Sequence, residues 1–141
     1  MAIVDTSFLI ALQDEDDHFH RRAKETPLIG DRFLVPWEIW IECCQTLMRM
    51  VPGRQAAAAV SSVLHGPFHV DKVLSAEEIA ALVARSEAVQ RVLKRLGHRP
   101  LSLFDLIVCA VAQRYRESIL TFHEGMIAAV QHRLFPGARI H

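Results

Sequence analysis

The chain has 141 residues, 51% of them hydrophobic, and its 16 Lys and Arg side chains balance its 16 Asp and Glu side chains. This length supports one sizeable core, so we expect a single domain over residues 1–141. The balanced charge excludes the global basic field of a typical nucleic-acid-binding protein, so any site for a polyanion must be local. No apolar run reaches the roughly 20 residues of a membrane helix, and we expect no membrane span.

The beginning of the chain enters a strand pattern at once and carries no basic segment. We therefore expect neither a signal nor a transit peptide, and a cytoplasmic location. Cysteine use agrees with this, because Cys43 and Cys44 are adjacent on a predicted helix, where they cannot bridge each other without distortion, and Cys109 is left over. We expect all three to be reduced thiols of the core.

The first element is a short apolar strand over Ala2–Val4, which ends on Asp5 and leads into a helix. Thr6 or Ser7 can cap this helix. In an open α/β sheet, ligands bind outside the carboxyl ends of the strands, so a carboxylate at this place is positioned for function. Burial of a carboxylate there for stability alone would cost free energy.

The remaining elements alternate between helices and strands. Pro27 and Gly30 close the second helix, and a capping box from Ser75 to Glu78 opens the longest one. Helical patterns cover residues 18–25, 37–50, 55–64, 76–96, 102–116 and 125–133, and short strands are expected at 33–35, 68–70, 118–121 and 138–140. This alternation predicts a three-layer α/β/α domain with a central, mostly parallel sheet of four to five short strands.

Three acidic residues stand in apolar surroundings. Asp5 ends the first strand, Glu42 interrupts the apolar run 39–44, and Asp105 lies within the apolar run 101–108. They can meet if each lies at the same edge of the sheet. Carboxylates brought together repel and raise one another's pKa, so such a cluster needs a cation. Ligands that are all oxygen favour Mg²⁺ or Mn²⁺ over zinc.

Each of these carboxylates also has a purely structural interpretation. Asp5 is a favoured type of helix N-cap. Glu42 can be a residue of an exposed helix face, with Glu38 one turn earlier on the same side. Asp105 completes a capping pattern that begins at Ser102. The functional interpretation therefore rests on the three occurring together.

Four motifs occur in a fixed order along the chain. They are Ile3-Val4-Asp5-Thr6-Ser7, Val35-Pro36 with Glu42 six residues later, Leu101-Ser102-Leu103-Phe104-Asp105, and Leu120-Thr121-Phe122. By their order and spacing, the chain resembles the PIN-domain family, and within it the small VapC-like toxins of type II toxin–antitoxin modules. The resemblance covers essentially the whole chain.

The resemblance implies a PIN-like fold in which Asp5, Glu42 and Asp105 are the catalytic and metal-binding residues, with Mg²⁺ or Mn²⁺ as the cofactor. Thr6 or Ser7 would be a hydroxyl near the metal. The implied activity is a metal-dependent endoribonuclease that hydrolyses RNA phosphodiester bonds. The implied partners are the RNA substrate, a cognate antitoxin protein and a second copy of the chain in a homodimer.

The chain departs from the family pattern after the predicted fourth strand. Such proteins usually carry an acidic residue two positions after the strand-end threonine, here Thr121, but this chain has His123 there, followed by Glu124. Three interpretations are open. Glu124 supplies the missing metal ligand, or His123 binds a water or a phosphate oxygen, or the site works with fewer ligands or only weakly. Thr121 itself is a further candidate contact to water or phosphate.

The chemistry can be stated from the residues. A divalent ion held by few direct carboxylate bonds and several waters would polarise a phosphodiester and lower the pKa of an attacking water. Single-stranded or loop RNA suits a shallow acidic site, because its splayed strands expose their phosphates.

Two alternative functions are considered. A phosphatase with Asp5 as nucleophile would usually carry a second Asp two residues on, where this chain has Ser7. A PIN-like module that binds RNA or protein without cutting, or cuts weakly, is supported by His123. Trp37 and Trp40 belong either to the core or to a partner surface, since Trp is enriched at interfaces.

Overall fold

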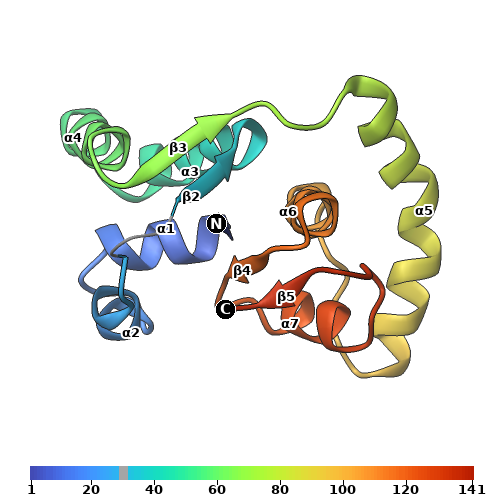
Figure 1. The fold of residues 1–141 in the computed structure, drawn as a ribbon. Helices are drawn as coiled ribbons and strands as arrows, with labels where there is room; N and C mark the ends of the chain where they lie inside the picture. The colour runs from blue at the N-terminus through green and yellow to red at the C-terminus, as the bar shows by residue number, and fades with distance from the viewer. Residues whose placement is uncertain (29–31) are drawn as a thin grey trace.

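The computed structural model describes residues 1–28 and 32–141, and Figure 1 shows the arrangement of its helices and strands. The strands are β1 (Ala2–Val4), β2 (Phe33–Pro36), β3 (Phe68–Asp71), β4 (Ser118–Leu120) and β5 (Arg139–Ile140). The helices are α1 (Thr6–Gln13), α2 (His20–Glu25), α3 (Trp37–Met50), α4 (Gly53–Leu64), α5 (Ala76–Arg95), α6 (Leu103–Tyr115) and α7 (Glu124–Gln131).

The five strands form one sheet in the order β3-β2-β1-β4-β5, and every pairing is parallel. The chain moves outward from β1 through β2 to β3, and then crosses to the other side of β1 to add β4 and β5. The order of strands therefore reverses between β1 and β4. The carboxyl ends of two strands at such a switch point form the usual ligand crevice of an open parallel sheet.

The centre of the sheet is buried because helices flank it. Ile3 and Val4 of β1, Val35 of β2 and Ile119 of β4 have no exposed surface. Strands buried on both faces have short, continuous apolar sequences, and the strands were predicted from these sequences. The predicted α/β architecture with a parallel sheet is confirmed, and the sheet has no antiparallel strand among the described residues.

Several element ends differ from the predicted ones for local reasons. The N-cap of α1 is Asp5, whose side chain accepts a hydrogen bond from the Phe8 amide, and not Thr6 or Ser7. Helix α4 begins two residues early because Pro52, with φ of −55°, serves as its N-cap. Helix α7 begins at Glu124 because the His123 side chain caps it. The expected helix closure at Gly30 lies outside the described residues.

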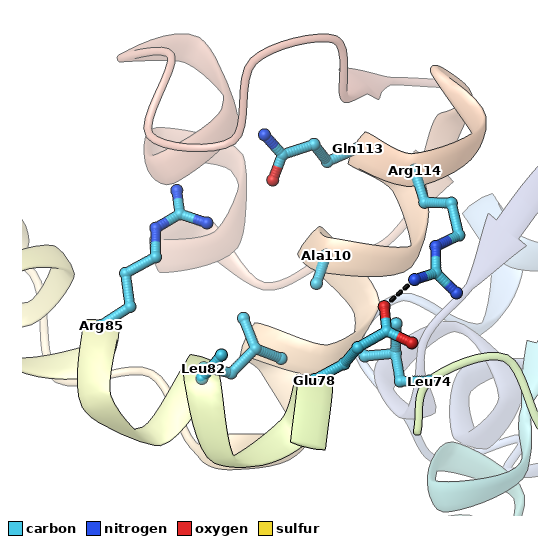
Figure 2. Close-up of a pocket in the computed structure, with 8 residues that line it drawn as sticks. Leu74, Glu78, Leu82, Arg85, Ala110, Gln113 and Arg114 are labelled. Atoms are coloured by element: carbon cyan, nitrogen blue, oxygen red, sulfur yellow. Dashed lines mark ion pairs between the residues drawn. The ribbon is translucent and has the colours of Figure 1, made fainter. Parts of the chain in front are cut away.

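Helix α5 is the long helix at the right edge of Figure 1, and it packs on α6 and α7. Figure 2 shows its first turns facing α6, where Glu78 forms an ion pair with Arg114. A hollow of about 310 Å³ lies between the two helices and is lined mainly by apolar groups such as Leu74 and Leu82. Among the described residues, no helix combines the length and the apolar character needed to cross a membrane.

The predicted capping box of α5 is confirmed. Ser75 Oγ accepts a hydrogen bond from the Glu78 amide at 3.1 Å, and the Ser75 amide donates to Glu78 Oε1 at 3.1 Å. We expect Ser75→Ala to lower the free energy of unfolding by about 1 kcal/mol, because the Glu78 N–H loses its side-chain acceptor. Urea unfolding would measure this, with the mid-helix Ser86→Ala as a matched control. Equal losses for both variants would contradict the capping role.

The three cysteines are free thiols, as expected from the sequence. Cys43 and Cys109 are buried, and Cys44 is partly buried. Burial raises the pKa of the Cys43 thiol to about 12. This thiol stays protonated at neutral pH, so it acts as a small apolar side chain of the core.

Candidate active site

Asp5 lies at the switch point of the sheet, directly after β1. Its backbone N–H donates to the Leu120 carbonyl at the end of β4, at 3.2 Å. Its side chain is only 3% exposed and is surrounded by donors. Oδ1 accepts hydrogen bonds from Ser7 Oγ at 2.8 Å and from the Phe8 amide at 3.0 Å, and Oδ2 accepts one from Thr121 Oγ1 at 2.5 Å.

The Asp5 carboxyl has a raised pKa. Burial is the main cause and raises the pKa from 3.8 to about 6, in spite of the lowering effect of the hydrogen bonds from Thr121, the Phe8 amide and Ser7. The negative charge of Asp105 raises it further. Hydrogen bonds from these three donors therefore do not replace the solvation that a carboxylate has in water, and a nearby positive charge would stabilise the ionised form.

Two hydroxyl groups connect Asp5 to the loop after β4. Ser7 Oγ, which donates to Asp5, accepts a hydrogen bond from the Phe122 amide at 3.0 Å. Thr121 Oγ1, which also donates to Asp5, accepts one from the His123 amide at 2.9 Å. From the sequence, we expect Ser7 to be a hydroxyl near the metal and Thr121 to contact water or phosphate. In the structure, both of them hold the Asp5 carboxylate in one orientation and fix the path of the loop.

Glu42 reaches the same region from α3. Thr6 Oγ1 donates a hydrogen bond to Glu42 Oε1, so α1 and α3 are joined at this point. Partial burial raises the pKa of Glu42, the Thr6 hydrogen bond lowers it, the charge of Asp105 raises it and His123 lowers it. Glu42 therefore lies within electrostatic range of both Asp105 and His123.

Asp105 completes the capping box of α6, whose N-cap is Ser102, and it also lies within electrostatic range of the other two carboxylates. Its amide donates to Ser102 Oγ at 3.2 Å, and its Oδ2 accepts from the Ser102 amide at 2.9 Å. The structural role considered for Asp105 is thus real. Its charge nevertheless raises the pKa of both Asp5 and Glu42. The structure brings the three predicted acids together as one electrostatic group, here called the acidic set.

His123 joins the acidic set through its ring. Nδ1 accepts a hydrogen bond from the Met126 amide at 3.2 Å, which makes His123 the N-cap of α7. A neutral ring that accepts at Nδ1 carries its proton at Nε2, and Nε2 lies 3.6 Å from Asp105 Oδ2. The resemblance led us to expect an acidic residue at position 123. This chain has a histidine there, and its Nε2–H is a hydrogen-bond donor.

Glu124 lies outside the acidic set. It is the first residue of α7 and is exposed. Among the described residues, no hydrogen bond or ion pair connects it with Asp5, Glu42 or Asp105. It lines a hollow together with His123, His98 and Arg99. Of the four acids considered as metal ligands, Asp5 and Glu42 each lie within electrostatic range of Asp105, whereas Glu124 influences the pKa of neither.

The acidic set matches the ligand chemistry of a hydrated divalent cation. Within the described residues, no group of three or more His, Cys, Asp or Glu side chains is arranged so that it could hold a metal ion as it stands. Mg²⁺, however, usually binds through one or two carboxylates and keeps several of its waters. Glu38, one turn before Glu42 on α3, has a buried Oε2 without a hydrogen-bond partner in the described part of the chain. Oxygen donors and uncompensated negative charge are both present, so Mg²⁺ or Mn²⁺ fits.

The position of the His123 ring depends on a glycine. A Cβ at Gly125 would lie 3.1 Å from His123 Cε1 and 3.1 Å from Leu101 Cδ2. We expect Gly125→Ala to displace the ring and lower the free energy of unfolding by about 1–3 kcal/mol. Urea unfolding would measure this, and Gly53→Ala is the control, because a Cβ at that helix position meets nothing within 4 Å. If Gly125→Ala were as stable as Gly53→Ala, the ring would not be held there.

Comparison with known proteins agrees with the geometry. The family model of the PIN domain matches residues 2–131. A similar solved structure is the crystal structure of Mycobacterium tuberculosis VapC20, described as a toxin that cleaves the sarcin–ricin loop. It is 26% identical with a TM-score of 0.65, over 92% of this chain and 95% of that chain. No curated protein sequence matches this chain significantly.

Proposed function

Because the chain belongs to the PIN-domain family, we propose that it is a metal-dependent endoribonuclease and the toxin of a type II toxin–antitoxin module. The observation that supports this proposal is that Asp5, at the switch point of the sheet, and Glu42 on α3 both lie within electrostatic range of Asp105 on α6. The likeness to VapC20, a toxin described as cleaving the sarcin–ricin loop, supports RNA as the substrate.

In this proposal, Asp5, Glu42 and Asp105 hold Mg²⁺ or Mn²⁺. A divalent ion at this place supplies polarisation of the phosphodiester and a lower pKa for the attacking water. The protein supplies orientation. Ser7 and Thr121 fix the Asp5 carboxylate by hydrogen bonds, and Thr6 fixes Glu42 in the same way.

His123 has a different role in the proposal. Its Nε2–H, 3.6 Å from Asp105, is placed to donate a hydrogen bond to a phosphate oxygen that enters the acidic set. The donor partly offsets the repulsion between the phosphate and the carboxylates. A PIN-like module that binds RNA without cutting is the second candidate function, because a histidine here reduces the number of acidic ligands. The phosphatase alternative is less favoured, since Ser7 is occupied in holding Asp5.

A surface on α3 supports a protein partner. Trp37 and Ile41 are each 47% exposed and Met48 is 71% exposed, and their spacing of four and seven residues places them on one side of the helix. Trp40, in contrast, is buried in the core. Exposed apolar helix faces of this kind bind an amphipathic helix of a partner. We propose that the antitoxin covers this face, and that the chain acts as a single-domain homodimer in the cytoplasm.

Controlled expression in a bacterial host tests the proposed function. Induction of the chain should stop growth and produce new RNA 5′ ends at defined places, while Asp5→Asn should allow growth and leave the RNA intact. Co-expression of a small protein encoded beside this gene should restore growth. If the parent and Asp5→Asn are equally harmless, and no new RNA ends appear, the binding module is the better account.

A further inference from the structure

Two hollows meet at the loop between α5 and α6. The first, of about 380 Å³, is lined by Gly97, His98, Arg99, His123, Glu124 and Gly125. The second, of about 680 Å³, shares His98 and Arg99 and is otherwise lined by Glu87, Gln90, Arg91, Lys94 and Pro100. The two volumes lie in the range of roughly 300–1,000 Å³ that is typical of small-ligand pockets. The shared loop makes them neighbouring parts of one surface.

The first hollow opens beside the acidic set. His123 forms part of its wall, and the Nε2 atom of the same ring lies 3.6 Å from Asp105. Gly125 contributes to the wall without a side chain, and the His123 ring lies against it. A group bound in this hollow is therefore separated from Asp105 of the acidic set by one imidazole ring.

The shared loop and the end of α5 carry basic side chains that can bind the phosphates of an RNA backbone. Arg99 and Lys94 are exposed, and neither has an ion-pair partner among residues 1–28 and 32–141. Arg91 is paired with Glu87 at 3.0 Å. An arginine with its guanidinium free can bind a phosphate by two parallel hydrogen bonds. The loop thus carries positive charge beside an otherwise acidic centre.

Glu124 adds a carboxylate, which accepts hydrogen bonds, to the lining of the first hollow. A carboxylate accepts hydrogen bonds and repels phosphate, so this side of the hollow does not suit the RNA backbone. It suits a base. Single-stranded RNA is commonly read through the Watson–Crick edges of unstacked bases. On guanine, that edge carries two adjacent N–H donors, which match the two oxygens of one carboxylate.

Resting on the proposed ribonuclease function, we propose that this hollow is the subsite for a guanine nucleotide next to the cleaved phosphodiester. The Glu124 carboxylate accepts hydrogen bonds from the guanine base, and Arg99 binds the phosphate of the same nucleotide. The lining of the hollow by Glu124, Arg99 and His123 together carries this assignment. Glu124 thereby acts in choosing the substrate and not in binding the metal.

A pool of random single-stranded RNA tests the role of Glu124. The wild-type chain should cut the pool with guanine enriched at one position beside the cleavage point, and Glu124→Gln should reduce that enrichment roughly tenfold. Glu77→Gln is the matched control, because Glu77 is also an exposed acid in the first turn of a helix. Identical base profiles for Glu124→Gln and Glu77→Gln would overturn the proposal.

Binding of the same pool tests Arg99 without any need for cleavage. All proteins carry Asp5→Asn, and binding is measured at several salt concentrations. Adding Arg99→Ala should weaken binding roughly five- to tenfold for all sequences and reduce the salt slope by about one. Arg95→Ala, at the end of α5 and four residues before Arg99, is the control, because Arg95 lines neither hollow. Equal effects of the two would overturn the subsite.

The two tests separate this proposal from the proposed function. RNA bound by the Asp5→Asn proteins is sequenced, so guanine enrichment that depends on Glu124 is visible even if no variant cuts RNA. In that case the subsite stands and the nuclease activity does not. Cleavage by the wild type with no dependence on Glu124 or Arg99 leaves the nuclease activity in place and removes the subsite.

Discussion

Asp5→Asn is expected to lower the rate of RNA cleavage on the order of 1,000-fold or more, the usual effect of removing a central catalytic group. Asp5 is the carboxylate at the switch point, in contact with Ser7 and Thr121 and in electrostatic range of Asp105. An amide in its place has no negative charge to bind a cation. The rate of cleavage of a fluorescent RNA in the presence of Mn²⁺ measures the loss.

The fold should survive this substitution, which makes the loss of activity interpretable. Asn is as good an N-cap as Asp, so the hydrogen bond from the Phe8 amide to the side chain remains. The Ser7 and Thr121 hydroxyls can rotate to suit the amide. Asp16→Asn, at an exposed position, is the control and should keep full activity. Full activity of Asp5→Asn itself would contradict the assignment of the site.

The second large effect concerns the free energy of unfolding of the metal-free protein and its dependence on pH. A carboxyl whose pKa is raised in the folded state favours folding when protonated, and this contribution is lost as pH rises through the folded-state pKa. For Asp5, the pKa rises from 3.8 to about 6 on folding. The wild type should therefore lose stability relative to Asp5→Asn between about pH 4 and pH 6. Above that range, the deficit should level off at roughly 3 kcal/mol.

Urea unfolding of both proteins in the presence of a chelator, from pH 4 to pH 8, measures this difference. Mn²⁺ added at pH 7.5 should stabilise the wild type, because a ligand that binds only the folded state shifts the equilibrium towards it. It should leave Asp5→Asn unchanged. A constant difference between the two proteins across the pH range would mean that burial does not destabilise the ionised Asp5 carboxylate.

The sequence predicted the acidic set because its members interrupt apolar patterns. Asp5 follows a continuous apolar strand, and Asp105 and Glu42 lie inside apolar helical runs. The apolar residues around each acid therefore identified it as a candidate site residue. The parallel α/β architecture followed from the alternation of elements. The place of β4 beside β1, which brings Thr121 to Asp5, depends on the strand order, and no local pattern encodes that order.

The environment of His123 could not be predicted in the same way. Histidine is not among the favoured N-cap residues, so its spacing to Met126 gave no signal for a cap. The position of its ring depends on the absence of a side chain at Gly125, where a Cβ would lie 3.1 Å from His123 Cε1. The surroundings of Glu124 could not be predicted from the sequence either. It is adjacent to His123 in the sequence, yet the start of α7 places it in the neighbouring hollow.

Some residues have roles beyond those predicted. Ser7 and Thr121 were expected near the site and lie there, but their hydroxyls are used by the Asp5 carboxylate. Asp105 completes the capping box of α6 and also lies 3.6 Å from His123 Nε2, so its structural role does not remove it from the candidate site. The buried Oε2 of Glu38 gave no signal in the sequence, because its burial depends on how α3 packs.

The rate of RNA cleavage by the purified chain, measured against Mn²⁺ concentration with Asp105→Asn in parallel, tests the central claim most directly. We expect no cleavage in chelator, a rate that rises to a plateau as Mn²⁺ is added, and little or no cleavage by Asp105→Asn at any Mn²⁺ concentration. Cleavage that persists in chelator, or an Asp105→Asn protein as active as the parent, would contradict a metal-dependent ribonuclease built on these three carboxylates.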